Sequence, residues 1–332
     1  MPRFFDGFEA GFSAASHEVA FRVAGCDFRC RTSDPGYARI LHQAFRLNSA
    51  ADSPSVRILV ETRGPFWPVW TDAFFREREV EARLEGGPFR FHYYDQADFW
   101  QIYQRETARG IQLLTRAGAY PEWDPGSPLR NHIHWALIER GAALVHAGTL
   151  AVDGQGVLLA GAGGSGKSGT VLSGLVNGLN SVGDDYVAVT TEGGIRAHLV
   201  FNGLKQDPAG FARIGLAARI DGQAALNWQG KHVFTMRDLG LPDQPEAISV
   251  RALCLPRVAH AARTTFTPVS AREAFLALAP SSVTQIPSAR AESFRMSATV
   301  ARELPAYRVD LGTDPSEIAD AFAGFIGGQG GC

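Results

Sequence analysis

Apolar and polar positions alternate over short stretches of this chain, and the pattern predicts an α/β protein built of many short elements. Residues 8–33 are predicted to form strands, because alternation is clear over 17–23 and a second stretch at 26–30 follows a glycine turn. Residues 37–45 are amphipathic at helical spacing, and residues 56–62 are typical of a strand.

The next part of the chain is predicted to contain a hairpin and then two helices. Gly86-Gly87-Pro88 separates the stretches 80–85 and 89–94, as the turn of a β-hairpin would. The apolar spacing predicts a first helix over residues 99–114 and a second over residues 129–140.

A second hairpin is predicted in the middle of the chain. The stretch from Gly141 to Val152 is apolar, and Asp153-Gly154-Gln155-Gly156 is a strong turn sequence. The next strand, residues 157–160, should therefore pair antiparallel with the one before it. Apolar residues then recur at helical spacing over 171–179, after a glycine-rich segment.

The glycine-rich segment matches the P-loop pattern Gly-x-x-x-x-Gly-Lys-Ser, which binds phosphate. Its glycines permit backbone conformations closed to other residues, so successive N–H groups can form an anion-binding nest. Lys167 is expected to reach the β/γ-phosphates, and the Ser168 hydroxyl to ligate Mg²⁺. The predicted nucleotide-binding residues are Gly161, Ala162, Gly163, Gly164, Ser165, Gly166, Lys167, Ser168 and Gly169.

An aspartate doublet, Asp184-Asp185, follows the P-loop after about one helix and one returning strand, a distance that can bring it back beside the loop. Adjacent strand residues face opposite ways, so one carboxylate could serve a metal and the other an acceptor hydroxyl. The alternative is a solvated Gly-Asp-Asp turn.

His146 lies on the strand that is predicted to pair with the P-loop strand. It is expected to hydrogen-bond an aspartate or to contact the γ-phosphate. The alternative is a hydrogen-bonded histidine of the core.

Composition bounds these interpretations. With 332 residues, two domains are the natural expectation, and a net charge of −2 gives no electrostatic footprint for nucleic acid or for an anionic membrane. No apolar run reaches the length of a membrane span, and the first residues lack a signal-peptide pattern. Four cysteines without a paired ligand motif are expected to be reduced, as in a cytoplasmic protein.

The chain is predicted to divide at a segment rich in proline, aspartate and glycine, residues 121–128. Residues 1–125 would form an accessory domain that helps to present the substrate. Residues 126–326 would form the P-loop catalytic domain, and residues 327–332 a flexible tail.

The ordered set of His146, the P-loop and Asp184-Asp185 resembles the catalytic domain of the HPr kinase/phosphorylase family, whose core resembles phosphoenolpyruvate carboxykinase. The resemblance covers about residues 129–325. It implies an α/β fold with a mixed, partly antiparallel sheet, and ATP and Mg²⁺ as cofactors. Its implied roles are one aspartate of the doublet as the base toward a serine hydroxyl, the other carboxylate and Ser168 as metal ligands, and His146 as support for the base. Asp184 is taken first as the base and Asp185 as the metal ligand, and the reverse assignment stays open.

The sequence departs from that family at two places. Gly169 follows Lys-Ser where threonine or glutamate is more usual, and Gly203 to Pro208 stands where HPr kinases carry a glycine-rich acidic signature. HPr itself and the reverse phosphorolysis are therefore not implied. The segments Gly230-Lys231 and 304–312 look more like the HPr-kinase-like proteins of peptide-modification clusters, which include kinases of lasso-peptide precursors.

The expected function is ATP- and Mg²⁺-dependent phosphorylation of a serine in a peptide or small protein, with no nucleic-acid or membrane partner. Lys205 and Lys231 are further candidates for contact with triphosphate or substrate, although surface lysines are the default. A homo-oligomer is compatible with the sequence. The alternatives are a small-molecule kinase or carboxykinase-like enzyme, and a nucleotide-binding regulatory module without transfer.

Overall fold

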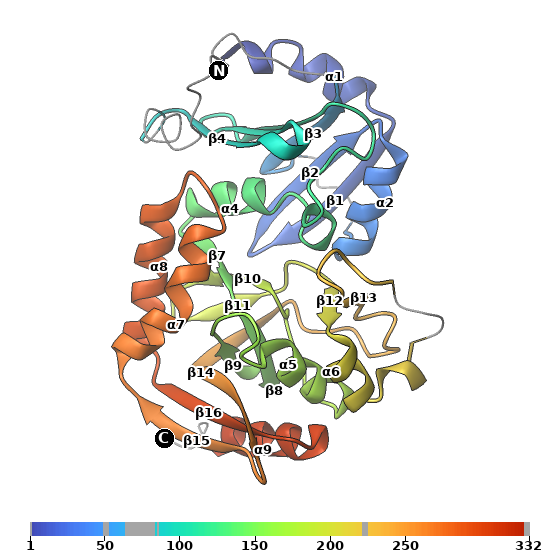
Figure 1. The fold of residues 1–332 in the computed structure, drawn as a ribbon. Coiled ribbons are helices and arrows are strands. Elements are labelled where there is room, and N and C mark those ends of the chain that lie inside the picture. Colours follow the sequence, from blue (N-terminus) through green and yellow to red (C-terminus); the bar gives the residue numbers. More distant parts are fainter. Residues whose placement is uncertain (1, 49–52, 64–83, 85, 221–224, 329–332) are drawn as a thin grey trace. The chain divides into compact units, whose positions relative to one another are not determined.

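The computed structural model describes residues 2–48, 53–63, 84, 86–220 and 225–328. Internal contacts divide the chain into two compact units, the first of residues 1–140 with 286–290, the second of residues 141–285 with 291–332. Helices and mixed sheets occur in both units (Figure 1). The predicted α/β class with mixed sheets is therefore confirmed.

The first unit is built around a six-stranded sheet in the order β1-β2-β3-β6-β5-β4. The pairs β2–β3 and β3–β6 are parallel, and the other pairs are antiparallel. Its strands are β1 (His17–Val23), β2 (Cys26–Thr32), β3 (Val56–Thr62), β4 (Phe89–Tyr94), β5 (Phe99–Gln104) and β6 (Arg109–Leu114). Its helices are α1 (Phe8–Ala14), α2 (Pro35–Ala44) and α4 (Arg130–Ile138), with single 3₁₀ turns at Pro2–Phe5, Asp95–Ala97 and Asp124–Gly126.

Two predictions for this unit are wrong. Residues 8–14 form helix α1, which buries Phe8 and Phe12 one turn apart on one face. The predicted helix over residues 99–114 is the strand pair β5–β6. All of β5 except its last residue is buried, so the polar alternation that marks a half-exposed strand is missing.

The predicted hairpin around Gly86-Gly87-Pro88 is only partly described. Its second arm is strand β4, which pairs with β5. Its first arm, residues 80–85, lies outside the described residues apart from residue 84.

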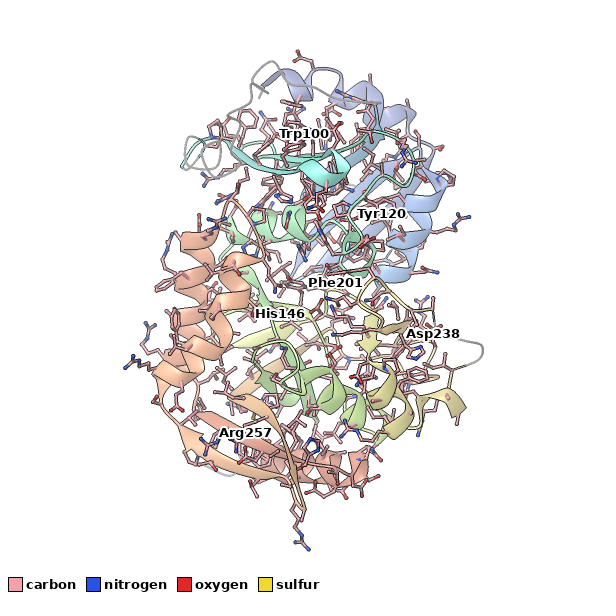
Figure 2. All side chains as sticks on the ribbon, viewed as in Figure 1. Trp100, Tyr120, His146, Phe201, Asp238 and Arg257 are labelled. Atoms are coloured by element: carbon pink, nitrogen blue, oxygen red, sulfur yellow. The ribbon has the colours of Figure 1, made fainter. Side chains whose placement is uncertain are left out.

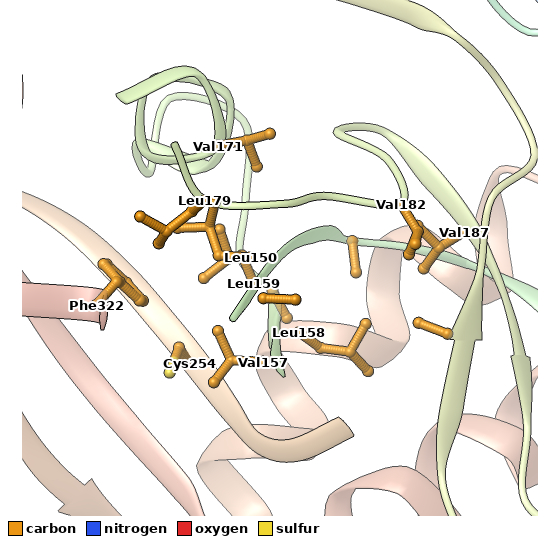
Figure 3. Close-up of a cluster of buried hydrophobic side chains, with 14 of the residues drawn as sticks. Leu150, Val157, Leu158, Leu159, Val171, Leu179, Val182, Val187, Cys254 and Phe322 are labelled. Atoms are coloured by element: carbon orange, nitrogen blue, oxygen red, sulfur yellow. The ribbon is translucent and has the colours of Figure 1, made fainter. Parts of the chain in front are cut away.

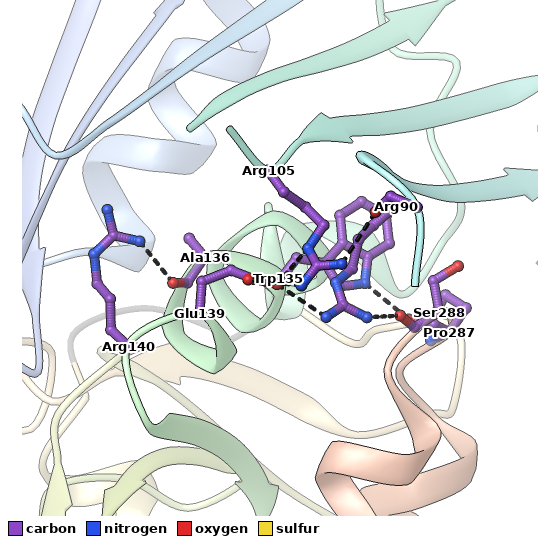
Figure 4. A network of polar contacts seen from close by, with 9 residues as sticks. Arg90, Arg105, Trp135, Ala136, Glu139, Arg140, Pro287 and Ser288 are labelled. Atoms are coloured by element: carbon purple, nitrogen blue, oxygen red, sulfur yellow. Dashed lines mark hydrogen bonds and ion pairs between the residues drawn. The ribbon is translucent and has the colours of Figure 1, made fainter. Parts of the chain in front are cut away.

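Polar contacts of α4 and β4 explain why residues 286–290 belong to the first unit (Figure 4). The Trp135 indole N–H donates to the Pro287 carbonyl at 2.8 Å, and Arg90 donates to the Ser288 carbonyl. Arg90 and Arg105 both pair with Glu139, each at 2.9 Å.

The segment predicted as a linker, residues 121–128, lies inside the first unit. Asp124 is fully buried there and accepts a hydrogen bond from the Tyr37 hydroxyl at 2.8 Å. The contact division therefore falls after Arg140 rather than at residue 126. The independence of the two units as domains stays a prediction.

The second unit contains an eight-stranded sheet with the path β15-β16-β14-β11-β10-β7, to which β9 is added beside β14 and β8 beside β9. A separate two-stranded sheet joins β12 and β13. The strands are β7 (Ala142–His146), β8 (Gly148–Val152), β9 (Gln155–Leu159), β10 (Tyr186–Thr190), β11 (Arg196–His198), β12 (Gly203–Gln206), β13 (His232–Thr235), β14 (Ala247–Ala261), β15 (Thr265–Val269) and β16 (Ala306–Gly312). The helices are α5 (Lys167–Val176), α6 (Pro208–Arg213), α7 (Ala271–Thr284), α8 (Arg290–Glu303) and α9 (Pro315–Gly328), with a 3₁₀ turn at Leu216–Ala218.

The predicted hairpin before the P-loop is confirmed, because β8 pairs antiparallel with β9 through the turn at residues 153–154. On its other side β9 runs parallel to β14. Helix α5 packs on this hairpin over a cluster of fully buried side chains, part of which Figure 3 shows. Its members include Leu150, Val157, Leu158, Leu159, Val171 and Cys254.

Gly174, in the middle of α5, is explained by this packing. A Cβ at position 174 would stand 2.3 Å from the Leu150 Cδ2 atom on β8. The helix therefore lies closer to the hairpin than any residue other than glycine at position 174 would allow.

Among the described residues, none of the helices is long and apolar enough to cross a membrane.

We expect Gly174→Ala to lower the free energy of unfolding by about 1–3 kcal/mol, because overpacking outweighs the gain of roughly 1 kcal/mol in helix propensity. Urea denaturation measures the change. Gly324→Ala in α9 is the matched control, since a Cβ there meets nothing within 4 Å. The control should be neutral or stabilising, and equal stabilisation of both variants would contradict the close approach.

Asp124 gives the first unit a pH-dependent stability. Burial raises its pKa to about 7, although the Tyr37 hydrogen bond and the Arg130 charge act in the opposite direction. Between about pH 4 and pH 7 the folded state keeps a proton that the unfolded state has released, so stability falls as pH rises. Asp124→Asn should remove up to about 1.4 kcal/mol per pH unit of this slope. Urea titrations of both proteins at several pH values test this, and parallel pH profiles would contradict it.

Candidate functional site

The P-loop connects β9 to α5, and its backbone explains two of its glycines. Gly166 caps the helix with φ +104°, where a Cβ would stand 2.6 Å from the Leu311 Cδ1 atom. Gly161 has φ +152°. Lys167 is 7% exposed, and its ammonium group donates to the carbonyls of Gly161 and Ala162. The predicted nucleotide-binding residues therefore form one loop and the first turn of one helix.

A backbone hydrogen bond holds the aspartate doublet beside the β8–β9 hairpin, which leads into the P-loop. The Thr149 N–H on β8 donates to the Gly183 carbonyl at 2.9 Å, directly before Asp184. The chain then continues into β10, which pairs antiparallel with β7. The structure thus brings the doublet, the hairpin and the P-loop helix into one neighbourhood, as the spacing predicted.

Asp184 is a buried carboxylate whose oxygens make no hydrogen bond of normal geometry with the described residues, although the Ser168 hydroxyl lies close enough to stabilise its charge. It is 3% exposed, and neither of its oxygens has a hydrogen-bond partner among the described residues. Burial and the neighbouring Asp185 raise its pKa to about 6, while Lys205, the nearby Ser168 hydroxyl and Lys167 lower it. Such a carboxyl is poised to take up a proton or a cation.

Asp185 has the opposite environment. Its Oδ1 accepts from His146 Nε2 at 2.9 Å, and its Oδ2 accepts from Lys205 Nζ at 2.9 Å. Burial raises the pKa of this carboxyl, but the contacts with His146 and Lys205 outweigh burial and hold the pKa well below its usual range. Asp185 is therefore ionised, with both oxygens engaged.

His146 does not lie where the sequence placed it. It is the last residue of β7, in register with Tyr186 of β10, whereas the partner of the P-loop strand is β8. The apolar run from Gly141 to Val152 contains two strands, because β7 ends at His146 and β8 begins at Gly148. The expected contact with an aspartate is nevertheless present. The backbone N–H of His146 donates to the Ser282 hydroxyl of α7 at 3.0 Å. Figure 2 labels His146 among the side chains of the second unit.

The two candidate lysines differ in their engagement. Lys205 on β12 is paired with Asp185. Lys231 has no hydrogen bond or ion pair from its ammonium group within the described residues, yet it lies near enough to lower the pKa of Lys167. Burial is the main cause that lowers the pKa of Lys167, and both aspartates of the doublet oppose it.

The residues fit a magnesium ion that is shared with phosphates. No cluster of three or more His, Cys, Asp or Glu residues that could cage a metal occurs in the described part of the chain. Mg²⁺ does not need one, since it commonly takes one or two protein ligands, substrate phosphates and waters. The unpartnered oxygens of Asp184 and the adjacent Ser168 hydroxyl supply oxygen donors of that kind. Asp185, the predicted ligand, would have to exchange one of its present partners.

Sequence reasoning missed one charged residue at this site. A Cβ at Gly169 would stand 3.3 Å from Nη2 of Arg213, so the guanidinium lies over the first turn of α5. Arg213 ends α6 and belongs to no sequence motif that would single it out among the many arginines of the chain. Only the small residue at 169 signalled that a neighbour approaches there.

We expect Asp184→Asn to raise the free energy of unfolding by about 1–3 kcal/mol at pH 7.5 without nucleotide or divalent cation, because it removes a buried, unpartnered charge. Chemical denaturation measures the difference. Asp153→Asn in the exposed β8–β9 turn is the control and should stay within about 0.5 kcal/mol of wild type. A loss of stability in Asp184→Asn would mean that the carboxylate has a stabilising partner.

Comparison with known proteins adds no family to this description: no protein-family model matches the chain, and no curated protein matches it.

Proposed function

We propose that this chain is an ATP- and Mg²⁺-dependent kinase that phosphorylates a serine hydroxyl of a peptide or small protein. The observation that carries the proposal is Asp184, a buried carboxylate with both oxygens free beside the P-loop lysine and serine. A loop that only binds nucleotide could use such a group solely as a magnesium ligand. A phosphoryl-transfer site needs one to receive the proton of the acceptor.

In the proposed reaction the serine oxygen attacks the γ-phosphorus of ATP while Asp184 accepts the hydroxyl proton. The new bond joins the serine oxygen to phosphorus, and the bond from phosphorus to the β–γ bridging oxygen breaks. ADP leaves with that electron pair. Lys167 and the N–H groups of the P-loop bind the phosphates throughout.

Ser168 and a carboxylate of the doublet would hold Mg²⁺, which supplies neutralisation of the phosphate charge. His146 and Lys205 fix Asp185 and keep it ionised. This pairing leaves Asp184 as the carboxyl whose pKa is raised toward neutrality, the direction that suits a general base.

The finer fold assignment belongs to the same proposal. A core of the HPr kinase and phosphoenolpyruvate carboxykinase type is supported by the antiparallel β8–β9 hairpin before the P-loop and by the contact of His146 with the doublet. The first unit would help to present the acceptor. Of the alternatives, a small-molecule kinase gains little support, because Lys205 is already neutralised by Asp185.

Asp184→Asn should reduce transfer by about 100- to 10,000-fold and leave ATP affinity nearly unchanged, because a base acts only in the chemical step. Lys167→Ala should weaken both. Transfer is measured by mass spectrometry of a serine-containing peptide encoded beside this chain, after incubation with ATP and Mg²⁺; EDTA should abolish it.

Asp153→Asn serves as the matched aspartate control. Near-normal transfer by Asp184→Asn would remove the base assignment. A selective loss of Mg²⁺ dependence in that variant would instead make Asp184 a metal ligand. No added phosphate on any serine peptide would refute the peptide-kinase proposal.

A further inference from the structure

Gly169 is the departure from the usual P-loop helix that the proposed function leaves unexplained. It lies in the first turn of α5 and does not have a positive φ, so its backbone does not require glycine. Relative to alanine, glycine costs a helix roughly 1 kcal/mol. Its neighbour is the Arg213 guanidinium, whose Nη2 atom would stand 3.3 Å from a Cβ at position 169 and would have to shift by a few tenths of an ångström to admit one.

The helix that carries Arg213 is held in place by its cap and its packing. The Asp207 side chain caps α6 by accepting from the Gly210 N–H at 2.9 Å. Phe211 packs against His232 and Phe234 of β13, with ring centroids 4.2 and 5.9 Å apart. Arg213 follows two residues later, at the last position of the helix, and is exposed.

The guanidinium of Arg213 is uncommitted. It makes no hydrogen bond or ion pair with any residue that the structure describes, whereas Arg219, six residues on, donates to the Val176 carbonyl at the far end of α5. Neither aspartate of the doublet pairs with Arg213, since Asp185 is engaged with His146 and Lys205 and the oxygens of Asp184 have no hydrogen-bond partner among the described residues.

The position over α5 faces anion-binding groups. The first helical hydrogen bond runs from the Thr170 N–H to the Gly166 carbonyl, so the N–H groups of residues 167–169 precede the helical ladder. They carry the positive end of the helix dipole. A second, independent feature marks the same place as a ligand site, namely the buried and unpartnered carboxylate of Asp184 near Ser168.

We propose that Arg213 binds the phosphate chain of the nucleotide at the first turn of α5, in the space that Gly169 leaves open. This inference rests on the nucleotide site of the proposed function and adds to it a phosphate ligand from outside the P-loop motif. The planar guanidinium can donate two parallel hydrogen bonds to phosphate oxygens. Gly169 and Arg213 therefore act together: the glycine admits the guanidinium, and the guanidinium supplies the contact.

The test measures the affinity of the full chain for ATP and for ADP with Mg²⁺, by isothermal titration calorimetry. Arg213→Ala should weaken both nucleotides by about 10- to 100-fold, the range for loss of a charge-assisted hydrogen bond. Arg213→Lys should recover part of the lost affinity, because lysine keeps the positive charge but cannot donate the two parallel hydrogen bonds of a guanidinium. Arg219→Ala is the matched control and should change neither affinity by more than about twofold.

The outcomes separate this inference from the function on which it rests. If wild type binds nucleotide but phosphorylates no serine peptide, the kinase proposal fails, and a selective loss of ADP affinity in Arg213→Ala still supports the inference. If Arg213→Ala binds ADP as tightly as wild type does, the inference is overturned while the kinase proposal stands. The same follows if Arg219→Ala loses as much ADP affinity as Arg213→Ala. Failure of wild type to bind either nucleotide overturns both. Unchanged melting temperatures of the variants would show that the fold is intact.

Discussion

The close approach of α5 to the β8–β9 hairpin is the constraint on which the site depends. A Cβ at Gly174 would collide with Leu150, and one at Gly148 would stand 2.8 Å from the Val171 Cγ2 atom. A helix packed this closely cannot slide without losing contacts along its length. Its N-terminus is therefore fixed at the end of β9, and the hydrogen bond from Thr149 to the Gly183 carbonyl fixes the doublet to the same hairpin. Backbone packing, rather than the polar groups themselves, sets where the polar groups meet.

Two neighbouring aspartates show how such a scaffold separates chemical roles. Asp184 and Asp185 are chemically identical and adjacent, yet the pKa of one is raised and that of the other lowered. The difference comes from partners on β7 and β12, because His146 and Lys205 both approach Asp185. The negative charge that is stabilised on Asp185 repels a negative charge on Asp184 and so raises the pKa of Asp184. The pair behaves as one coupled unit, in which fixing one carboxylate keeps the other ready for a proton or a cation.

The parts of this fold that the sequence predicted are those with local signals. The turn at Asp153-Gly154 and the P-loop glycines specify geometry within a few residues, and the doublet follows the P-loop after a single helix. The failures share a different cause. Strand β5 is buried on both faces, so nothing in its pattern distinguishes it from a buried helix. The apolar run over residues 141–152 divides at Ala147, where the adjacent Gly148 is its single turn signal. The partners of Asp185 and the approach of Arg213 to Gly169 come from β12 and α6, and contacts between distant segments leave no periodic trace.

Most charged groups around the P-loop have partners among the described residues, and Asp184 does not. Lys205 and Asp185 neutralise each other, and Lys167 is engaged with carbonyls of its own loop. Asp184 is left without a hydrogen bond although it is buried, in a unit whose core is otherwise well packed. Local rules of polar satisfaction are broken in native proteins mainly where a ligand completes them. A phosphate chain with Mg²⁺ would satisfy both signs at once, since its oxygens suit Lys167 and the N-terminus of α5 while its cation suits Asp184 and Ser168. The residues that make the site costly for the ligand-free protein are therefore the ones that a metal-bound nucleotide, as in the proposed function, would satisfy.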